Sequence, residues 1–360
     1  MRSIVYLGMD VHQDFIEVVG IGVKGSESLF RNRVKNDHKA LREYLGGLSR
    51  GVELRCCYEA SSCGYVVYRW LREWGIECQV IAPSLMPRLP GDRQKTDGRD
   101  AYKLAIWNRG EQLTSVRVPD LVEEGVRTLV RCREAASQDV VRARHRLLKF
   151  LQGQGLIYRA GRNWTKRHWQ YLRGIQFEGS LRVVFDEYMS RLEYHLYRLQ
   201  ELDRKVEAIA QSQAFKSSVG VLCCLRGIGV LTAMVLLTEI IDFRRFGRAG
   251  QLMSYVGLVS SQHSSGNVVR MGPITKTGNR RCRAALIESA WHYRHKPALG
   301  VRLKNALRNQ SAEMGLISWK AQQRLYKKYW NVANRKGNQK AVVAVARELT
   351  GFVWAIMQQA

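Results

Sequence analysis

The first hundred residues alternate between short apolar runs and polar segments that carry turn or helix-start residues. The runs show the continuous or two-residue apolar periodicity of strands, and Lys24-Gly25-Ser26-Glu27 between two of them is typical of a hairpin turn. Asn36-Asp37 precedes a stretch with helical spacing. The predicted elements are strands at residues 3–9, 15–23, 28–34, 52–58 and 77–82, and helices at residues 38–48, 64–74 and from Asp97 onward.

This order of three strands, helix, strand, helix, strand and helix is that of an α/β domain with an RNase H-like fold. Its first three strands form a meander, and the ends of its first and fourth strands lie side by side. We assign residues 1–115 to this domain. The remaining residues show mainly helical spacing, so the predicted fold class is α/β followed by all-α.

Beyond Pro119 a basic amphipathic helix is predicted as far as residue 152, with Asp120 and Glu123 as its start signal. A second helical stretch repeats apolar residues every three or four positions, which favours an antiparallel helical hairpin or a dimer seam. Ordinary helices packed on their own domain are the alternative. The repeating residues of this coiled-coil region, 116–215, are Leu181, Phe185, Tyr188, Leu192, Leu196, Leu199, Leu202, Val206 and Ile209.

Residues 216–360 are predicted to form a mostly helical domain with three polar features. The segment 225–229 (Leu-Arg-Gly-Ile-Gly) precedes an apolar helix, and this helix-hairpin-helix-like signature exposes backbone N–H groups to a phosphate, although Gly-x-Gly also serves plain tight turns. Residues 257–267 are predicted to form a polar loop rich in hydroxyl groups. Residues 276–283 open a basic helix.

The chain is strongly basic, and its charge is unevenly distributed. The 360 residues carry 58 Lys and Arg against 31 Asp and Glu, a formal net charge of +27 with a pI near 10.1. Residues 1–115 hold 17 basic and 14 acidic residues, and the rest of the chain holds 41 and 17. Nucleic acid is the commonest polyanionic partner of such a surface, and its binding should weaken steeply with salt.

The eight cysteines include no Cys-x-x-Cys pair, which favours core packing in a reducing compartment over a zinc or disulfide role. The N-terminus lacks a secretory pattern, and the longest apolar stretch, residues 228–241, is interrupted by Glu239 and too short to cross a bilayer. We therefore expect a cytoplasmic protein without a membrane partner.

Four carboxylates fall where this topology brings segments together: Asp10 and Glu59 at the ends of the first and fourth strands, and Asp97 and Asp100 at a helix start. Converging carboxylates on a basic protein are suited to hold divalent metal against a polyanion, and two Mg²⁺ ions about 4 Å apart activate phosphodiester cleavage. Each acid alone has a simpler explanation as a cap or an ion-pair partner. Their joint placement predicts a Mg²⁺ site.

The polar loop offers a nucleophile, because a serine that attacks a phosphodiester conserves its energy in a phosphoserine link. The spacing does not choose among Ser260, Ser261, Ser264 and Ser265. His263 is better explained as a hydrogen-bonding loop residue than as a base.

The chain resembles the DEDD transposases of the IS110 insertion-sequence family over nearly its whole length and in the same order. The Lys-Thr-Asp-x-x-Asp-Ala string is unusual and makes the match of the four acids to the family's acidic tetrad specific. The family's nucleophilic serine falls on Ser265, and the doublet Ser264-Ser265 leaves an ambiguity of one residue. The matching segments are residues 8–14, 56–64, 93–105, 227–229, 257–266 and 274–286.

This resemblance implies a RuvC-like domain, a coiled coil and a transposase domain in a prokaryotic, nucleoid-associated recombinase. It implies that a structured guide RNA pairs with target and donor DNA, that the enzyme assembles as dimers and tetramers, and that the serine of one subunit completes the acidic site of another. A hydrolytic RuvC-like junction nuclease and a non-catalytic nucleic-acid-binding protein are the alternatives.

The basic surface then has two nucleic acids to bind, with backbone contacts positioning them and base pairing specifying sequence. An aromatic cluster at 162–169 is suited to single strands or loop RNA, with an aromatic plug between helices as the alternative. A solvated basic face is the alternative for the residues after the serine loop. The candidate contacts are Arg162, Trp164, Lys166, Arg167, Gly227, Gly229, Arg270, Lys276, Arg280, Arg281 and Arg283.

Overall fold

The computed structural model describes residues 3–25, 27–83, 86, 96–265 and 268–359, with the side chain of Ser265 outside the described part. The chain divides into two compact units, Met1–Pro119 and Asp120–Ala360. The first boundary lies four residues beyond the predicted one at residue 115. The further division of the helical part at residue 215 stays a prediction.

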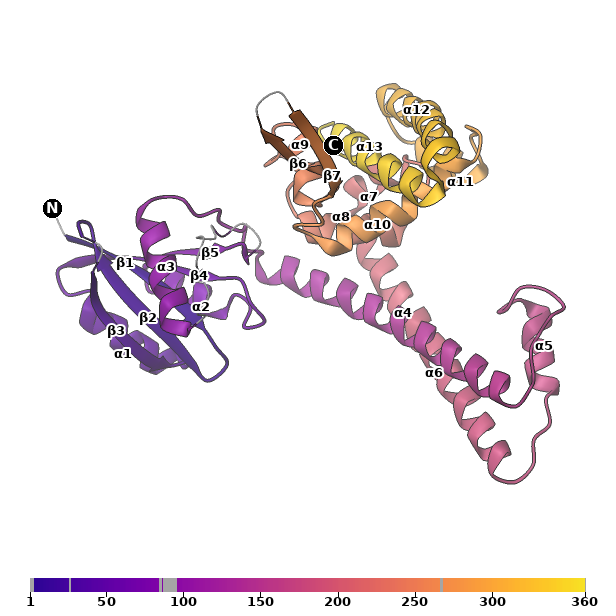
Figure 1. Ribbon diagram of the computed structural model, residues 1–360, viewed down its shortest axis with the longest axis horizontal. Coiled ribbons are helices and arrows are strands. Elements are labelled where there is room, and N and C mark those ends of the chain that lie inside the picture. The colour runs from indigo at the N-terminus through magenta and orange to yellow at the C-terminus, as the bar shows by residue number, and fades with distance from the viewer. Residues whose placement is uncertain (1–2, 26, 84–85, 87–95, 266–267, 360) are drawn as a thin grey trace. The chain divides into compact units, whose positions relative to one another are not determined.

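The first unit is a five-stranded mixed sheet flanked by helices (Figure 1). The strand order is β3-β2-β1-β4-β5, with β1, β2 and β3 antiparallel and β1, β4 and β5 parallel to one another. The ends of the first and fourth strands lie side by side, as the sequence predicts. The elements are β1 (Ser3–Val11), β2 (Phe15–Gly22), β3 (Ser28–Lys35), α1 (His38–Leu48), β4 (Val52–Glu59), α2 (Val66–Glu73), β5 (Glu77–Ile81) and α3 (Asp97–Arg109).

Alternation along β1 separates the two faces of this sheet. Leu7 and Met9 are fully buried in a core with Leu41 of α1 and Leu71 of α2. Gly8, between them, faces α3 instead. Asp10 therefore belongs to the face covered by α3, and it lies inside β1 rather than after it, because the strand continues to Val11.

The second unit is mainly helical (Figure 1). Asp120 caps its first helix, and the carboxylate of Glu123 completes a capping box, as the sequence predicts. The elements are α4 (Leu121–Gly153), α5 (Lys166–Gly174), α6 (Gly179–Ala210), α7 (Lys216–Cys223), α8 (Val230–Ile240), α9 (Ala249–Tyr255), β6 (Ser260–Ser265), β7 (Val268–Ile274), α10 (Arg280–Ala290), η2 (Trp291–Arg294), α11 (Val301–Leu307), α12 (Ala312–Lys336) and α13 (Asn338–Met357).

The long helices α4 and α6 run antiparallel beside each other (Figure 1). Phe185 and Leu192 of the predicted apolar stripe are buried against Leu147 and Leu151 of α4, and Val206 joins the larger core further along. These three residues of the apolar stripe therefore pack against other residues of the same chain. Leu181 at its start is exposed. A dimer seam built on these helices stays a prediction.

The predicted polar loop at 257–267 is wrong for its central part. Residues 260–265 and 268–274 form the antiparallel hairpin of β6 and β7, in which His263 pairs with Arg270 and Ser265 pairs with Val268. The polar residues lack the apolar alternation that indicates a strand, and the backbone ladder between the two segments supplies the order instead.

The core role predicted for the cysteines is wrong for Cys132, which is exposed on α4, and incomplete for the half-buried Cys63 and Cys223. The thiols that are buried are those of Cys56, Cys57, Cys78, Cys224 and Cys282. In the part of the chain that the structure describes, no helix combines the length and apolar character that crossing a bilayer requires.

Candidate active site

The packing of α3 on the sheet decides where the acids meet. A Cβ at Gly8 in β1 would overlap the carbonyl oxygen of Ala101 in α3. Cys57, the register partner of Gly8 on β4, faces the same helix, because its Sγ donates to the carbonyl oxygen of Leu104 over 3.4 Å. The missing side chain of Gly8 lets the helix lie directly on the central strands, so its first turn reaches the end of β1.

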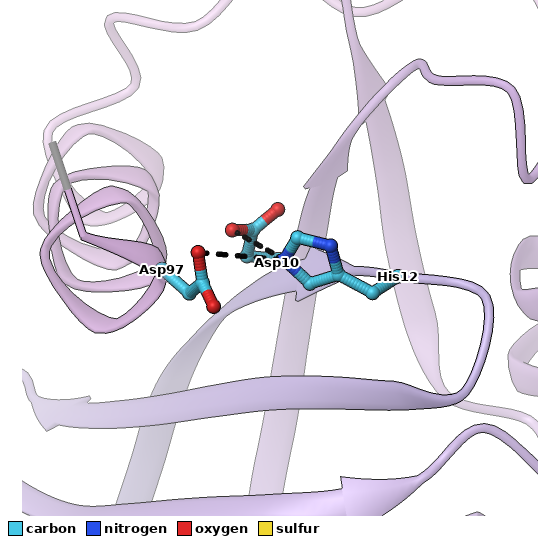
Figure 2. Close-up of side chains that lie close together, drawn as sticks. All are labelled: Asp10, His12 and Asp97. Carbon is cyan, nitrogen blue, oxygen red and sulfur yellow. Dashed lines mark hydrogen bonds and ion pairs between the residues drawn. The ribbon is translucent and has the colours of Figure 1, made fainter.

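Asp10, His12 and Asp97 converge at this position (Figure 2). The Nε2 atom of His12 lies 3.2 Å from Oδ2 of Asp10 and 3.6 Å from Oδ1 of Asp97. One ligand atom from each of the three residues lies within 4.8 Å of the other two. The fold thus joins an acid of β1 to an acid 87 positions later in the chain.

His12 is a site residue that the sequence reasoning missed. It stands two positions after Asp10, where an extended chain directs both side chains to the same side. The Asp-x-His spacing was the available signal. It was not specific, because nothing in the local sequence shows that Asp97 approaches the same place.

The charge at Asp10 is poorly compensated. Burial raises the pKa of Asp10, the His12 ring lowers it, and the nearby carboxylates of Asp97 and Asp100 raise it again, so the net direction is upward. Asp100 lies one turn into α3, with Oδ1 3.9 Å from Nζ of Lys103. The site gathers negative charge in a half-buried place, which is an arrangement that a bound cation would relieve.

Glu59, the remaining acid of the predicted set, ends β4. The parallel pairing of β1 with β4 runs to Met9 opposite Tyr58, so Glu59 continues the register opposite Asp10. Side chains alternate along a strand, and Glu59 follows Cys57 by two positions, so it lies on the α3 face. Among the residues described, Glu59 is not part of the three-residue group of ligand atoms.

The donor set fits a divalent cation. Two carboxylates and one imidazole nitrogen converge without a closed cage, since the side chains of His12 and Asp97 are 40% and 42% exposed. Carboxylate oxygens suit Mg²⁺ and Mn²⁺, and imidazole is better tolerated by Mn²⁺. Asp10, His12 and Asp97 could hold such an ion directly, with Asp100 and Glu59 beside them.

A fifth acid, Glu17, lies next to this group and was also missed. It pairs with Asp10 across β1 and β2, and its side chain is only 5% exposed. Burial raises the pKa of Glu17, but hydrogen bonds from Arg31 and Arg33 lower it, and the net direction is downward. Its charge is therefore held by arginines rather than left for a metal.

The predicted serines lie on the hairpin of the second unit. Ser261 donates to the carbonyl oxygen of Pro273 over 3.2 Å, and Gln262 donates to Oγ of Ser264 over 2.7 Å. Ser265 is the last residue of β6, next to residues 266–267, which lie outside the described part, as does its side chain. Ser264 is exposed and accepts that hydrogen bond, and the choice between Ser264 and Ser265 stays a prediction.

Comparison with known proteins matches both units. The family model of the IS110 DEDD transposases, described as a transposase, matches residues 7–154. A second model, described as the transposase IS116/IS110/IS902 family, matches residues 220–302. The first match contains the four predicted acids, and the second contains the hairpin.

Curated relatives match nearly the whole chain. A putative transposase, y4qE, of Sinorhizobium fredii is 40% identical over 363 residues, covering 99% of this chain and 89% of that protein. The transposase for insertion sequence element IS1533 of Leptospira borgpetersenii is 32% identical, covering 93% and 99%. The transposase for IS1111A of Coxiella burnetii is 24% identical, covering 99% and 90%. The chain belongs to the IS110 family of transposases.

As an IS110-family transposase, the protein is an enzyme that acts on DNA in the movement of an insertion sequence. The DEDD domain of this family implies an RNase H-like fold, which agrees with the mixed sheet of the first unit. Among the residues that the structure describes, Asp10, His12 and Asp97 of this transposase form a group that could hold a metal ion.

The start of α10, behind the hairpin of the transposase, is held by a buried carboxylate. Glu239 of α8 has a side chain only 2% exposed, and Arg131 of α4 donates to its two oxygens over 2.7 and 2.9 Å. Asn279, the N-cap of α10, donates to the same carboxylate over 2.8 Å. Three helices therefore meet at one acid, directly after β7 in the chain.

Two arginines that were predicted to contact DNA make hydrogen bonds within the transposase itself. Arg281 donates to Oε2 of Glu134 over 2.6 Å, and Arg283 donates to the carbonyl oxygen of Val256 over 2.8 Å. These two guanidinium groups hold α10 in place and have fewer N–H groups left for a phosphate. Near the hairpin, the predicted contacts Arg270, Lys276 and Arg280 are exposed, and Arg281 is also exposed although it is paired with Glu134.

The Gly-x-Gly turn has a packing role. Gly227 has a φ of +86°, and a Cβ there would overlap the carbonyl oxygen of Ser289. Gly229 is the N-cap of α8. The structure accounts for Gly227 by close approach to α10, so this residue needs no nucleic acid to explain it.

The aromatic cluster packs mainly as a plug against the helix pair. Trp164 and Trp169 lie on the core shared by α4, α5 and α6, and Trp164 has a φ of +65°. The buried His168 accepts from the backbone N–H of Trp164 over 3.1 Å. The cations of this segment remain exposed, namely Arg162, Lys166 and Arg167.

Proposed function

We propose that this transposase cleaves and rejoins DNA with Mg²⁺ held by the acidic cluster and with Ser265 as the nucleophile. The convergence of Asp10, His12 and Asp97 within 4.8 Å is the observation that carries the proposal. Glu59 and Asp100 complete the acidic set from the same face of the sheet. A bound divalent ion would polarise the phosphodiester and shield its charge from the acids.

The chain's own residues supply the covalent step. The Oγ of Ser265 bonds to phosphorus as the bond from phosphorus to one deoxyribose oxygen breaks, and the serine's proton is balanced by protonation of that leaving oxygen. Rejoining reverses the exchange with a different deoxyribose hydroxyl. His12 contacts Asp10 and Asp97 together and so fixes their spacing.

A structured guide RNA provides sequence recognition in this proposal. The second unit carries most of the basic residues, which suits backbone contacts to RNA and to donor and target DNA, while base pairing selects the sites. The exposed cations Arg162, Lys166, Arg167, Arg270, Lys276 and Arg280 are the contacts we propose.

Oligomers complete the site in this proposal. The acids belong to residues 1–119 and Ser265 to residues 120–360, and 165 positions separate Asp100 from the serine. A dimer or tetramer in which the serine of one subunit meets the acids of another satisfies the chemistry. The α4–α6 pair, through its exposed side chains such as Tyr194 and Tyr197, is the surface we propose for this contact.

The covalent link provides the decisive experiment. Labelled element ends are incubated with protein, guide RNA and Mg²⁺, and the products are separated on a denaturing protein gel. We expect wild type to retain labelled DNA, Ser265→Ala to lose it completely, and Ser264→Ala, the matched control, to retain it. Loss only in Ser264→Ala would move the nucleophile by one residue.

The same assay tests the two rival functions. Cleavage by wild type without any adduct, and unchanged cleavage by Ser265→Ala, would indicate a hydrolytic nuclease. Binding without cleavage at any Mg²⁺ concentration would indicate a non-catalytic binding protein. An adduct that forms equally well without RNA would remove RNA guidance from the proposal.

A further inference from the structure

Two arginines lie beside the acidic cluster and share one buried carboxylate. Glu17 accepts from Nε of Arg31 at Oε1 over 2.7 Å and from Nε of Arg33 at Oε2 over 3.1 Å. The Glu17 side chain is 5% exposed, whereas those of Arg31 and Arg33 are 54% and 58% exposed. The acid is thus inside and the two cationic groups reach the surface.

The strand register places these groups in line with the active site. Arg33 on β3 is opposite Glu17 on β2, and Glu17 is opposite Asp10 on β1. Directly paired residues of antiparallel strands point to the same face. Asp10, Glu17 and Arg33 therefore form a row across the face of the sheet that α3 covers. At the end of this row, Nη2 of Arg33 lies 3.7 Å from Oδ2 of Asp97.

Packing fixes the position of both guanidinium groups. The Cζ atom of Arg33 lies 4.0 Å from the ring centroid of Phe15. Arg31 lies against Gly98 in the first turn of α3, where a Cβ would overlap its guanidinium. Both cations are therefore held at the rim of the acidic site before any substrate arrives.

Both guanidinium groups have hydrogen-bond donors beyond those that Glu17 uses. Glu17 offsets one of the two positive charges, and the other lies near Asp97, whose Oδ2 is 3.7 Å from Nη2 of Arg33. Each guanidinium donates its Nε–H to Glu17. Its other N–H groups form a planar fork whose geometry matches that of a phosphate. Among the residues described, Arg31 has no other hydrogen-bond or ion-pair partner than Glu17.

We propose that Arg31 and Arg33 form a clamp for a phosphate of the DNA strand that is cleaved at the acidic cluster, with Glu17 as the positioning residue that holds both. This inference rests on the proposed function of that cluster. A phosphate in the clamp lies on the α3 face, so the strand continues from the arginines toward Asp10 and Asp97. The alternative role for Arg33 is only to offset the negative charge of Asp97.

The two roles predict different cleavage rates for Arg33→Gln in the full-length protein. Both predict tighter Mn²⁺ binding by the DNA-free protein in calorimetry, because a cation 3.7 Å from Asp97 is removed. The clamp predicts cleavage about tenfold to a hundredfold slower at saturating Mg²⁺, the range for losing a charge-assisted hydrogen bond. Charge offset alone predicts wild-type cleavage at saturating Mg²⁺.

Arg55→Gln is the matched control. Arg55 is a partly exposed arginine of the same sheet, and it pairs with Glu53 over 2.8 Å and Glu77 over 3.6 Å away from the acidic cluster. We expect it to cleave as wild type does. Arg33→Lys keeps the charge without the planar fork and should fall between Arg33→Gln and wild type. Melting temperatures separate a loss of function from a loss of folding.

DNA with one uncharged backbone linkage tests whether Arg33 contacts a phosphate. A methylphosphonate next to the cleavage position should slow wild type as much as Arg33→Gln does, and it should slow Arg33→Gln no further. Independent, additive losses at every tested position would overturn the clamp. So would an effect confined to guide RNA binding, with normal cleavage by the assembled complex. If Asp10→Asn also cleaves normally, the proposed function fails as well, so the two failures are distinguishable.

Discussion

Glu239 in the helical unit and Asp10 in the sheet unit are both withdrawn from water, but their surroundings treat the negative charge in opposite ways. Burial raises the pKa of Glu239, yet the hydrogen bonds from Arg131 and Asn279 outweigh it, so the net direction is downward. Burial also raises the pKa of Asp10, and the neighbouring acids add to the rise, with only His12 opposing.

The difference separates a carboxylate whose charge is held by the fold from one that we propose to bind a metal. Glu239 has its full set of donors, and it joins α4, α8 and the start of α10 below the hairpin that carries Ser265. Among the described residues, Asp10 has the His12 ring as its side-chain partner, and the carboxylates of Asp97 and Asp100 lie nearby. A half-buried carboxylate close to other carboxylates costs stability, and the cation that we propose for this site would relieve that repulsion.

The largest effect on DNA cleavage is expected for Asp10→Asn, which removes one negative charge from the acidic cluster. DNA cleavage should fall about a thousandfold or more, because the metal loses a ligand. DNA and RNA binding should stay close to wild type, and the melting temperature should stay equal or rise, because repulsion with Asp97 and Asp100 is relieved. Cleavage kinetics, filter binding and calorimetry measure the three quantities. A collapse of binding in a folded variant would contradict this assignment.

Glu239→Gln should do the reverse and reduce stability first. Removing the charge weakens the two hydrogen bonds from Arg131 and the one from Asn279 at a buried position, so the free energy of unfolding should fall by about 3 kcal/mol. For a unit of this size that corresponds to a fall in melting temperature of roughly 6–12 °C. A melting temperature equal to wild type would show that Glu239 is not a structural carboxylate.

The pH dependence of that difference gives a further check. The pKa of Glu239 in the folded protein lies below the ordinary glutamate value of 4.5, so its stabilisation is complete above that pH and disappears as the pH falls through the folded pKa. The gap in unfolding free energy between wild type and Glu239→Gln should therefore shrink as the pH is lowered from 6 toward 3. A gap that stays constant or widens would contradict the downward direction.

Gly8→Ala should give a smaller change in stability and should still slow cleavage. The added methyl group overlaps Ala101 and forces α3 away from β1, at a cost of about 1–3 kcal/mol. The movement separates Asp97 from Asp10 without changing any ligand, so cleavage should fall and more Mg²⁺ should be needed. Gly46→Ala is the matched control, because a Cβ there meets nothing within 4 Å. Equal cleavage by both variants would show that the packing of α3 against β1 does not determine the geometry of the proposed metal site.

Much of the first unit could be predicted because its signals are local. The apolar runs gave all five strands, and Asp37 and Asp120 marked two helix starts through capping that the structure contains. The hairpin of β6 and β7 was predicted as a loop, since its order comes from pairing with a partner strand rather than from its own residue pattern. The clusters around Glu17 and Glu239 gave no local signal at all.

The sequence alone predicted the four acids, the serine doublet and the basic surface as candidates for chemistry, and it determined the strand order that brings Asp10 toward Glu59. Tertiary structure decided how each charge is used. Whether a carboxylate holds arginines, as Glu17 and Glu239 do, or faces other acids, as Asp10 does, depends on groups that arrive from distant segments. The energy of a charge is set by everything within a few ångströms of it, and only the fold specifies those neighbours.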